Sequence, residues 1–302
     1  MPDKTTNTTG RKPPRQLELS AGVAMISFSA VWVKLVHVGP TVIGFYRMLF
    51  GALMLLAIVV LRGARLWHSR QTLLLALICG LLFAGDLVVW HRSVLAVGPG
   101  LATVLGNFQV FFLAAVGILI LHERPGWKAL AAIPLAMCGL LLIVGPKWQH
   151  VDAAYKLGVG LGLTTAMFYA SFVLVLRKLQ SRPDAPSPLV NITVSSIGTT
   201  VAIGIIGLLQ QESFAIPDSQ TFGILIVYGL CGQVLGWLLI TRSISAIPAS
   251  RVGLILLLQP TLAFIWDMVF FKRPTTPLEV AGALIALTAI YLGTPRETPL
   301  NP

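Results

Sequence analysis

The residues of this sequence that could do chemistry lie inside long apolar runs. Asp86 and Trp90 are four residues apart, so they share one face if their run is helical. A carboxylate beside an aromatic ring can hold an ammonium group by charge and by cation–π attraction. A partly desolvated carboxyl could also carry a proton in a coupled cycle. The alternative is that Asp86 only pairs with Arg47 or His91.

Amide side chains form a second set of candidates. Gln233 and Trp237 share one helical face by the same spacing. Amides can hold the carboxylate of a zwitterion, but they bond neighbouring helices equally well. The residues expected to line a binding cavity are Trp32, Asp86, Trp90, Asn107, Tyr169, Gln233, Trp237 and Gln259.

The elements that position these residues must lie in a membrane. Of the 302 residues, 56% are hydrophobic and 11% are charged, whereas a soluble domain has roughly 25% charged residues. The net charge of +11 comes from residues between apolar runs, which indicates membrane topology and not a surface for nucleic acid. Cys79, Cys138 and Cys231 lie in different runs without metal-ligand spacing, so we expect no metal and no cofactor.

Ten apolar runs can span a bilayer, which takes about 20 residues for ~30 Å of hydrocarbon. The sequence therefore predicts an all-α integral membrane protein with ten transmembrane helices. The predicted spans are 17–36, 41–61, 72–93, 100–121, 127–145, 156–177, 189–209, 221–241, 249–271 and 277–292. Residues 1–16 and 294–302 are expected to be polar tails. Residues 17–145 and 146–293 are expected to form two five-helix halves.

The charges between the runs predict the orientation. With the N-terminus in the cytoplasm, most of the 22 Lys and Arg residues fall on the cytoplasmic side, Arg62, Arg65 and Arg70 among them. Positive charge resists translocation, so both termini are expected in the cytoplasm. The predicted location is the inner (plasma) membrane of a bacterium, crossed several times.

The roles of Arg47 and Trp90 each allow more than one interpretation. A charge at bilayer depth costs roughly 2.5–3.5 kcal/mol, so it should face protein or water. Arg47 lies in the middle of its run and is expected mainly to brace the packing of helices, with contact to the substrate as the alternative. Trp90 precedes His91 and Arg92, so it could equally be an anchor at the membrane interface, where tryptophan is enriched.

The two halves repeat one another. Residues 90–99, WHRSVLAVGP, match residues 240–248, ITRSISAIP, and Gln109 matches Gln259 at the same separation of about 150 residues. Because each half has five spans, the second half must cross the membrane in the opposite sense. Inverted repeats are typical of secondary transporters, in which two half-bundles rock around a site at the midplane.

With these residues in place, the chain resembles the drug/metabolite transporter superfamily, in its EamA-type branch, over about residues 17–293. Within it, the chain looks most like YddG-type exporters of aromatic and other neutral amino acids. Two positions depart from the family pattern. Val110 stands where the family commonly has Pro, which weakens the case for a kink in the fourth run, and Lys272 replaces an acidic residue. The motif residues are Arg47, Arg92-Ser93 with Pro99, Glu123-Arg124-Pro125, Arg242-Ser243 with Pro248, Gln259-Pro260 and Arg273-Pro274.

The resemblance implies a mechanism and a cargo. Spans one, three, four, six, eight and nine would line a central cavity, and the other four would support them. Alternating access would export small metabolites, with aromatic and other neutral amino acids favoured, and Pro99, Pro248 and Pro260 would act as hinges. The expected partners are a small-molecule substrate and the lipid bilayer.

Other functions stay open beside this reading. Drugs, quaternary cations or purine-type metabolites are the alternative cargo, because a fold does not fix a substrate. A remote alternative is an intramembrane aspartyl protease using Asp86 and Asp267 as a dyad. The sequence lacks a protease pattern, so no enzyme is expected. Proton coupling and the oligomeric state are not determined by these residues.

Overall fold

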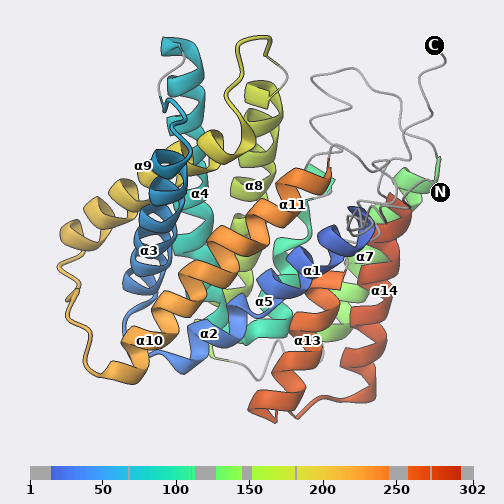
Figure 1. Ribbon diagram of the computed structural model, residues 1–302. Helices are drawn as coiled ribbons and strands as arrows, with labels where there is room; N and C mark the ends of the chain where they lie inside the picture. The colour runs from blue at the N-terminus through green and yellow to red at the C-terminus, as the bar shows by residue number, and fades with distance from the viewer. Residues whose placement is uncertain are drawn as a thin grey trace, which may run out of the picture.

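In the part of the chain that the structure describes, the regular elements are helices. Lipid offers the backbone no hydrogen-bond partners, and a helix satisfies its own backbone groups. The computed structural model describes residues 15–66, 69–109, 111–112, 127–144, 152–180, 182–244, 258–272 and 274–293. The helices are α1 (Arg15–Ser27), α2 (Ser29–Leu35), α3 (Pro40–Leu61), α4 (Arg70–Val97), α5 (Pro99–Gly106), α7 (Trp127–Val144), α8 (Ala153–Gln180), α9 (Pro188–Leu209), α10 (Ser219–Tyr228), the π-helix η2 (Gly229–Gly236), α11 (Trp237–Ile244), α13 (Leu258–Phe271) and α14 (Pro277–Gly293) (Figure 1).

Within the described residues, six helical segments are long and apolar enough to cross a membrane. They are Arg15–Leu35, Pro40–Leu61, Arg70–Val97, Ala153–Gln180, Pro188–Leu209 and Ser219–Ile240, and the helices Leu258–Phe271 and Pro277–Ala289 are shorter and also apolar. The all-α, multi-pass prediction is confirmed for these segments. The count of ten spans and their inverted arrangement stay predictions.

The helices form two packed groups with a third set between them. α4 packs along α8 and α9, and α3 packs along α9, while α7 packs along α14 on the other side of the molecule (Figure 1). Between these groups lie α1, α2, α5, α10, α11 and α13. The start of α1, the end of α14 and the loops after α3 and α8 lie toward the upper end in Figure 1.

Where the structure describes the predicted continuous runs, three of them are interrupted. The first run breaks at Phe28 between α1 and α2. The fourth run ends its first helix at Gly106, and a turn at Asn107 and Phe108 follows, although Val110 is not a proline. The eighth run contains the π-helix η2, where the helix is wound more widely than an α-helix.

The junction between α4 and α5 has a simple cause. Gly98 has φ +92° and ψ 159°, a backbone conformation that is essentially restricted to glycine. Pro99 then begins α5, because its fixed φ suits the first turn of a helix and its missing N–H needs no partner there. The chain therefore turns sharply at this point and returns into the bundle.

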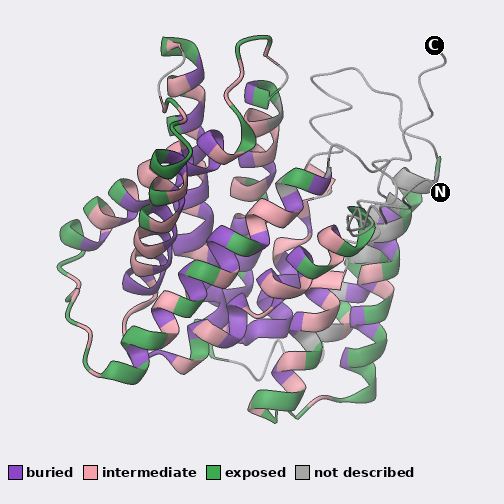
Figure 2. Cartoon of the chain, in the orientation of Figure 1, coloured by how far each residue is buried: buried purple, intermediate pink, exposed green. Residues whose placement is uncertain are grey.

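Burial follows the expected pattern for a protein in lipid. Buried residues gather where the helices meet, and exposed residues lie on the outer faces of the helices (Figure 2). Many of the exposed residues are large and apolar, such as Leu61 at 87% and Leu209 at 79% exposed. Exposure of so much apolar surface to water would be unfavourable, whereas lipid chains pack against it.

Candidate functional site

A central cavity lies among α3, α4, α5, α8, α11 and α13, beside the break between α1 and α2. It holds about 570 Å³ of empty space, including the part that is open to the outside. Its lining residues are Ile26, Ser29, Arg47, Phe83, Asp86, Leu87, Trp90, Thr103, Gly106, Asn107, Gln109, Thr165, Tyr169, Trp237 and Gln259.

One face of α4 forms a wall of this cavity. Phe83, Asp86, Leu87 and Trp90 recur every three or four residues, so they share one side of the helix. All four are buried in the bundle. The face that the spacing of Asp86 and Trp90 predicts is therefore the face that α4 turns to the cavity.

The short helix α5 contributes polar groups that are partly satisfied within the helix. The Thr103 hydroxyl donates a hydrogen bond to the Pro99 carbonyl at 2.8 Å. Asn107 Nδ2 donates to the Thr103 carbonyl at 2.8 Å. This local bonding leaves the amide oxygen of Asn107 for other partners.

Several cavity residues carry a buried polar atom that has no hydrogen-bond partner in the described part of the chain. These atoms are Asp86 Oδ1, Arg47 Nε, Gln109 Oε1 and Thr165 Oγ1. A buried polar group that lacks a partner costs about 1–3 kcal/mol, and more if it is charged. Four such groups around one cavity indicate a place where a polar molecule or water completes the bonding.

The side chain of Arg47 contacts a residue that is far from it in the sequence. Its Nη1 donates a hydrogen bond to the Tyr228 hydroxyl at 2.9 Å, and the guanidinium carbon lies 4.7 Å from the centre of the Tyr228 ring. His91 Nε2 lies 3.2 Å from the same hydroxyl. The structure describes both Arg47 and Asp86, and no ion pair within 4.0 Å joins them. The direct pair considered from the sequence is therefore not formed.

Aromatic side chains build the side of the cavity between α4, α8 and α11. Phe83 stacks on Phe172 with ring centres 5.0 Å apart, and Trp237 meets both rings edge-on at 5.9 Å. The Tyr169 ring lies 5.9 Å from that of Phe172. Offset and edge-on pairs of this kind are favourable, so the cluster gives the cavity a firm apolar wall.

The cavity brings together most of the predicted binding residues, but not all. Gln233 lies in η2 at a smaller neighbouring cavity, and its Nε2 donates to Ser196 Oγ at 2.9 Å, which makes it a bond between helices. Trp32 lies on α2, outside the lining set, with its Nε1 buried and unpartnered. Pro248 lies outside the described residues. The predicted residues that line the cavity are Asp86, Trp90, Asn107, Tyr169, Trp237 and Gln259.

Some residues of the site were missed from the sequence. Thr103 and Thr165 were not singled out because threonine is common in membrane helices and usually bonds the preceding turn. Tyr228 was missed because it is 181 residues from its partner Arg47. Tyr228, Gly232 and Gly236 recur every four residues. Small residues at this spacing could have indicated a helix that packs closely on its neighbours.

The second intramembrane aspartate lies elsewhere. Asp267 Oδ2 accepts a hydrogen bond from the backbone N–H of Gly100 at 3.2 Å, and Asp267 is not among the residues that line the cavity. The protease dyad of Asp86 and Asp267 is therefore wrong. Within the described part of the chain, no group of three or more His, Cys, Asp or Glu residues could hold a metal ion.

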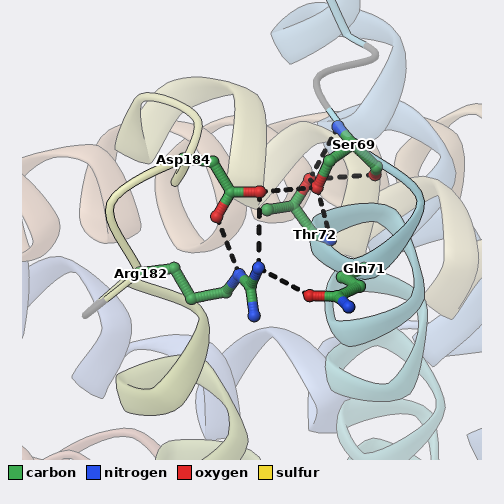
Figure 3. A network of polar contacts seen from close by, with 5 residues as sticks. All are labelled: Ser69, Gln71, Thr72, Arg182 and Asp184. Carbon is green, nitrogen blue, oxygen red and sulfur yellow. Dashed lines mark hydrogen bonds and ion pairs between the residues drawn. The ribbon is translucent and has the colours of Figure 1, made fainter.

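A polar network ties the helices at the upper end of the molecule (Figure 3). Ser69 and Thr72 form a capping box at the start of α4, and Ser69 Oγ donates to Asp184 at 2.7 Å. Arg182 donates to Asp184 at 2.8 Å and to Gln71 at 2.7 Å. The hydrogen bond from Arg182, followed by that from Ser69, lowers the pKa of Asp184 below its usual value.

A second network lies at the opposite end, where α4 ends and α3 begins. Arg92 Nη2 donates to Thr41 Oγ1 at 2.9 Å and to Gln210 Oε1 at 2.7 Å. Glu212 lies 3.7 Å from the same guanidinium. This network joins α3, α4 and the segment after α9 at the end opposite the network of Ser69 and Asp184.

Comparison with known sequences adds to this geometry. The sequence profile of the EamA-like transporter family matches residues 18–145 and again residues 156–294. The pseudopaline exporter CntI of Pseudomonas aeruginosa is 24% identical over 276 residues, which is 90% of this chain and 93% of that protein. A probable amino-acid metabolite efflux pump of Salmonella typhimurium is 23% identical over 201 residues, 64% of this chain and 66% of that protein.

Comparison with solved structures concerns the fold. One protein of known crystal structure superposes with a TM-score of 0.66 at 14% sequence identity, covering 93% of this chain and 96% of that one. At this identity the likeness shows a shared fold and nothing about the substrate.

Proposed function

Because this chain belongs to the EamA-like transporter family, we propose that it exports aromatic and other neutral amino acids by alternating access. Members of this family are secondary transporters and not enzymes. The relatives that it matches include an exporter and a probable amino-acid metabolite efflux pump. Their names support export as the direction of transport and an amino-acid-like cargo.

One observation carries the choice of cargo: a buried carboxylate with an unpartnered oxygen lies in a cavity walled by aromatic rings. Asp86 is 5% exposed, and its Oδ1 has no partner. Trp90 lies one turn away on the same face of α4, and Tyr169 and Trp237 line the same cavity. Such a site suits an ammonium group attached to an apolar or aromatic side chain.

The packing supports alternating access with the cavity shut at one end. Beyond Trp90, the last turns of α4 bury Val94 and Val97, and these residues join one apolar cluster with Val36, just after α2, and Leu101 of α5. We infer that this cluster shuts the cavity toward the end where Arg92 bonds Thr41 and Gln210. Release on that side requires these contacts to separate, with Gly98 and Pro99 as the hinge.

The runner-up cargo is a quaternary cation. The same carboxylate and rings could hold an alkylated ammonium group, because cation–π attraction does not need an N–H donor. An amino acid differs from such a cation because its carboxylate also needs a partner in the cavity.

The test is flux into proteoliposomes of the purified protein. Labelled L-phenylalanine, L-tryptophan, L-methionine and L-threonine are supplied with and without a pH gradient, and methyl viologen is the competing cation. We expect saturable flux of the aromatic amino acids. Flux of methyl viologen without flux of any amino acid would replace this proposal with the runner-up. A response of the flux to the gradient would establish proton exchange.

A further inference from the structure

We propose that Arg47 binds the carboxylate of the transported molecule, and that Tyr228 and His91 hold its guanidinium in place. This assignment rests on the proposed amino-acid cargo and gives the central cavity a charge of each sign. It differs from the main role suggested by the sequence alone, in which Arg47 braces the helices and contact with the substrate is the lesser alternative.

The first ground is the position of Arg47. It lies in the middle of α3, is 4% exposed and lines the same cavity as Asp86. A guanidinium has five N–H donors in a planar fork. The bond to Tyr228 uses one of them, and Nε is buried without a partner. An arginine that only braced its helices would be expected to use more of these donors.

The second ground is the way in which the guanidinium is held. Arginine can only donate, so the Tyr228 oxygen accepts from Nη1, and the phenol proton is then available to His91 Nε2. Tyr228 and His91 are each 0% exposed. The Tyr228 ring also lies under the guanidinium at 4.7 Å. A buried phenol and imidazole therefore fix one edge of the fork and leave the other edge for a ligand.

The third ground is that α3 also packs through contacts that do not use the side chain of Arg47. α3 approaches η2 through glycines: a Cβ on Gly51 would lie 2.7 Å from the Gln233 side chain, and one on Gly229 would lie 3.1 Å from the Arg47 carbonyl. Close contact between backbones is the usual way in which helices bind in lipid. A buried charge costs free energy, and packing through these glycines does not by itself call for one.

The fourth ground is the arrangement of charge. Arg47 and Asp86 line one cavity without a direct ion pair, and each has an unpartnered buried atom. A zwitterion can neutralise both, with its ammonium at Asp86 and its carboxylate at Arg47, where a planar fork suits a carboxylate. A cation without a carboxylate would meet the repulsion of Arg47. The cavity therefore favours α-amino acids over quaternary cations.

The test compares three probes of one shape: L-phenylalanine, 2-phenylethylamine, which lacks the carboxylate, and 3-phenylpropionate, which lacks the ammonium. Flux into proteoliposomes is measured for wild type, Arg47→Gln and Tyr228→Phe. Arg92→Gln is the matched control, because Arg92 bonds Thr41 and Gln210 outside the cavity. We expect wild type to carry L-phenylalanine at least tenfold better than 2-phenylethylamine.

The variants separate a binding role from a bracing role. Arg47→Gln should lower kcat/KM for L-phenylalanine by roughly 10- to 100-fold, as expected when a hydrogen bond to a charged group is lost. It should keep or raise the flux of 2-phenylethylamine. Tyr228→Phe should raise the KM for L-phenylalanine but not that for 2-phenylethylamine. Arg92→Gln should leave the ratio of the L-phenylalanine flux to the 2-phenylethylamine flux unchanged. An equal fall of both fluxes in Arg47→Gln overturns the assignment and leaves the proposed function standing.

Two measurements on wild type need no folded variant. Thermal stabilisation by the three probes is expected to be greatest for L-phenylalanine. Equal stabilisation by L-phenylalanine and 2-phenylethylamine would overturn the carboxylate role of Arg47. Flux of 2-phenylethylamine without flux of any amino acid would instead overturn the proposed function and the assignment together.

Discussion

The carboxylate of Asp267 accepts a hydrogen bond from the backbone N–H of Gly100 at 3.2 Å and so joins α13 to the first turn of α5. The first N–H groups of a helix have no partner within it, and Pro99 has no N–H to offer. A carboxylate from another helix thus acts as the cap, helped by the positive end of the helix dipole. This bond sets how α5 presents Thr103 and Asn107 to the cavity.

Removal of this cap should weaken the fold. We expect Asp267→Ala to lower the free energy of unfolding by about 1–3 kcal/mol, because it leaves a buried N–H without its partner. Asp267→Asn keeps an acceptor oxygen and should lose less. Thermal unfolding in detergent, followed by tryptophan fluorescence, measures both. Equal losses in the two variants would mean that the Gly100 bond does not matter.

Close packing of α4 on α9 should make one glycine intolerant of any side chain. A Cβ on Gly80 would lie 2.7 Å from the Ser195 carbonyl oxygen, which belongs to backbone and cannot move aside cheaply. Gly80→Ala should therefore destabilise the protein by about 1–3 kcal/mol. Gly160→Ala is the control, since nothing lies within 4 Å of its Cβ. A Gly80→Ala protein as stable as the control would contradict the packing.

Loss of the Asp86 charge should affect transport more than stability. Asp86→Asn keeps the size of the side chain but removes the partner for an ammonium group, so uptake of L-phenylalanine should fall roughly 10- to 100-fold. The flux assay in proteoliposomes measures this. Asp267→Asn is the control for a buried aspartate outside the cavity. Full activity of Asp86→Asn would show that the ammonium is bound elsewhere.

The network at the upper end predicts a dependence of stability on pH. The pKa of Asp184 is lowered in the folded protein by the hydrogen bond from Arg182. A carboxylate of this kind stabilises the fold above its unfolded pKa, and the stabilisation is lost as the pH falls through the folded pKa. Asp184→Asn should therefore lower the melting temperature at pH 7 and make little difference at strongly acidic pH. A difference that does not change with pH would point to lost packing instead.

Pro260 tests the hinge on the α13 side. It lies near the start of α13 and follows Gln259, which lines the cavity. If the helix bends there during the cycle, Pro260→Ala should slow exchange several-fold with little change in the KM for L-phenylalanine. Pro134→Ala, inside α7, is the control. Unchanged rate and unchanged accessibility to labelling reagents in Pro260→Ala would exclude the hinge.

Local properties of the sequence determined the elements. Hydropathy over some 20 residues decides whether a helix is stable in lipid, so the apolar runs predicted the membrane helices directly. The spacing of Asp86 and Trp90 determined that they share a face, because helical geometry depends only on near neighbours. That face does line the cavity.

The tertiary structure decided which residues meet. No local pattern shows that Arg47 reaches Tyr228, which is 181 residues away, or that the Gln233 amide is used on Ser196. Such pairs depend on how each helix is rotated and displaced against its neighbours, and the π-helix at Gly229–Gly236 changes that rotation within one run. The sequence therefore determined the helices and one wall of the cavity. The packing of distant helices decided which of their charges are left without partners.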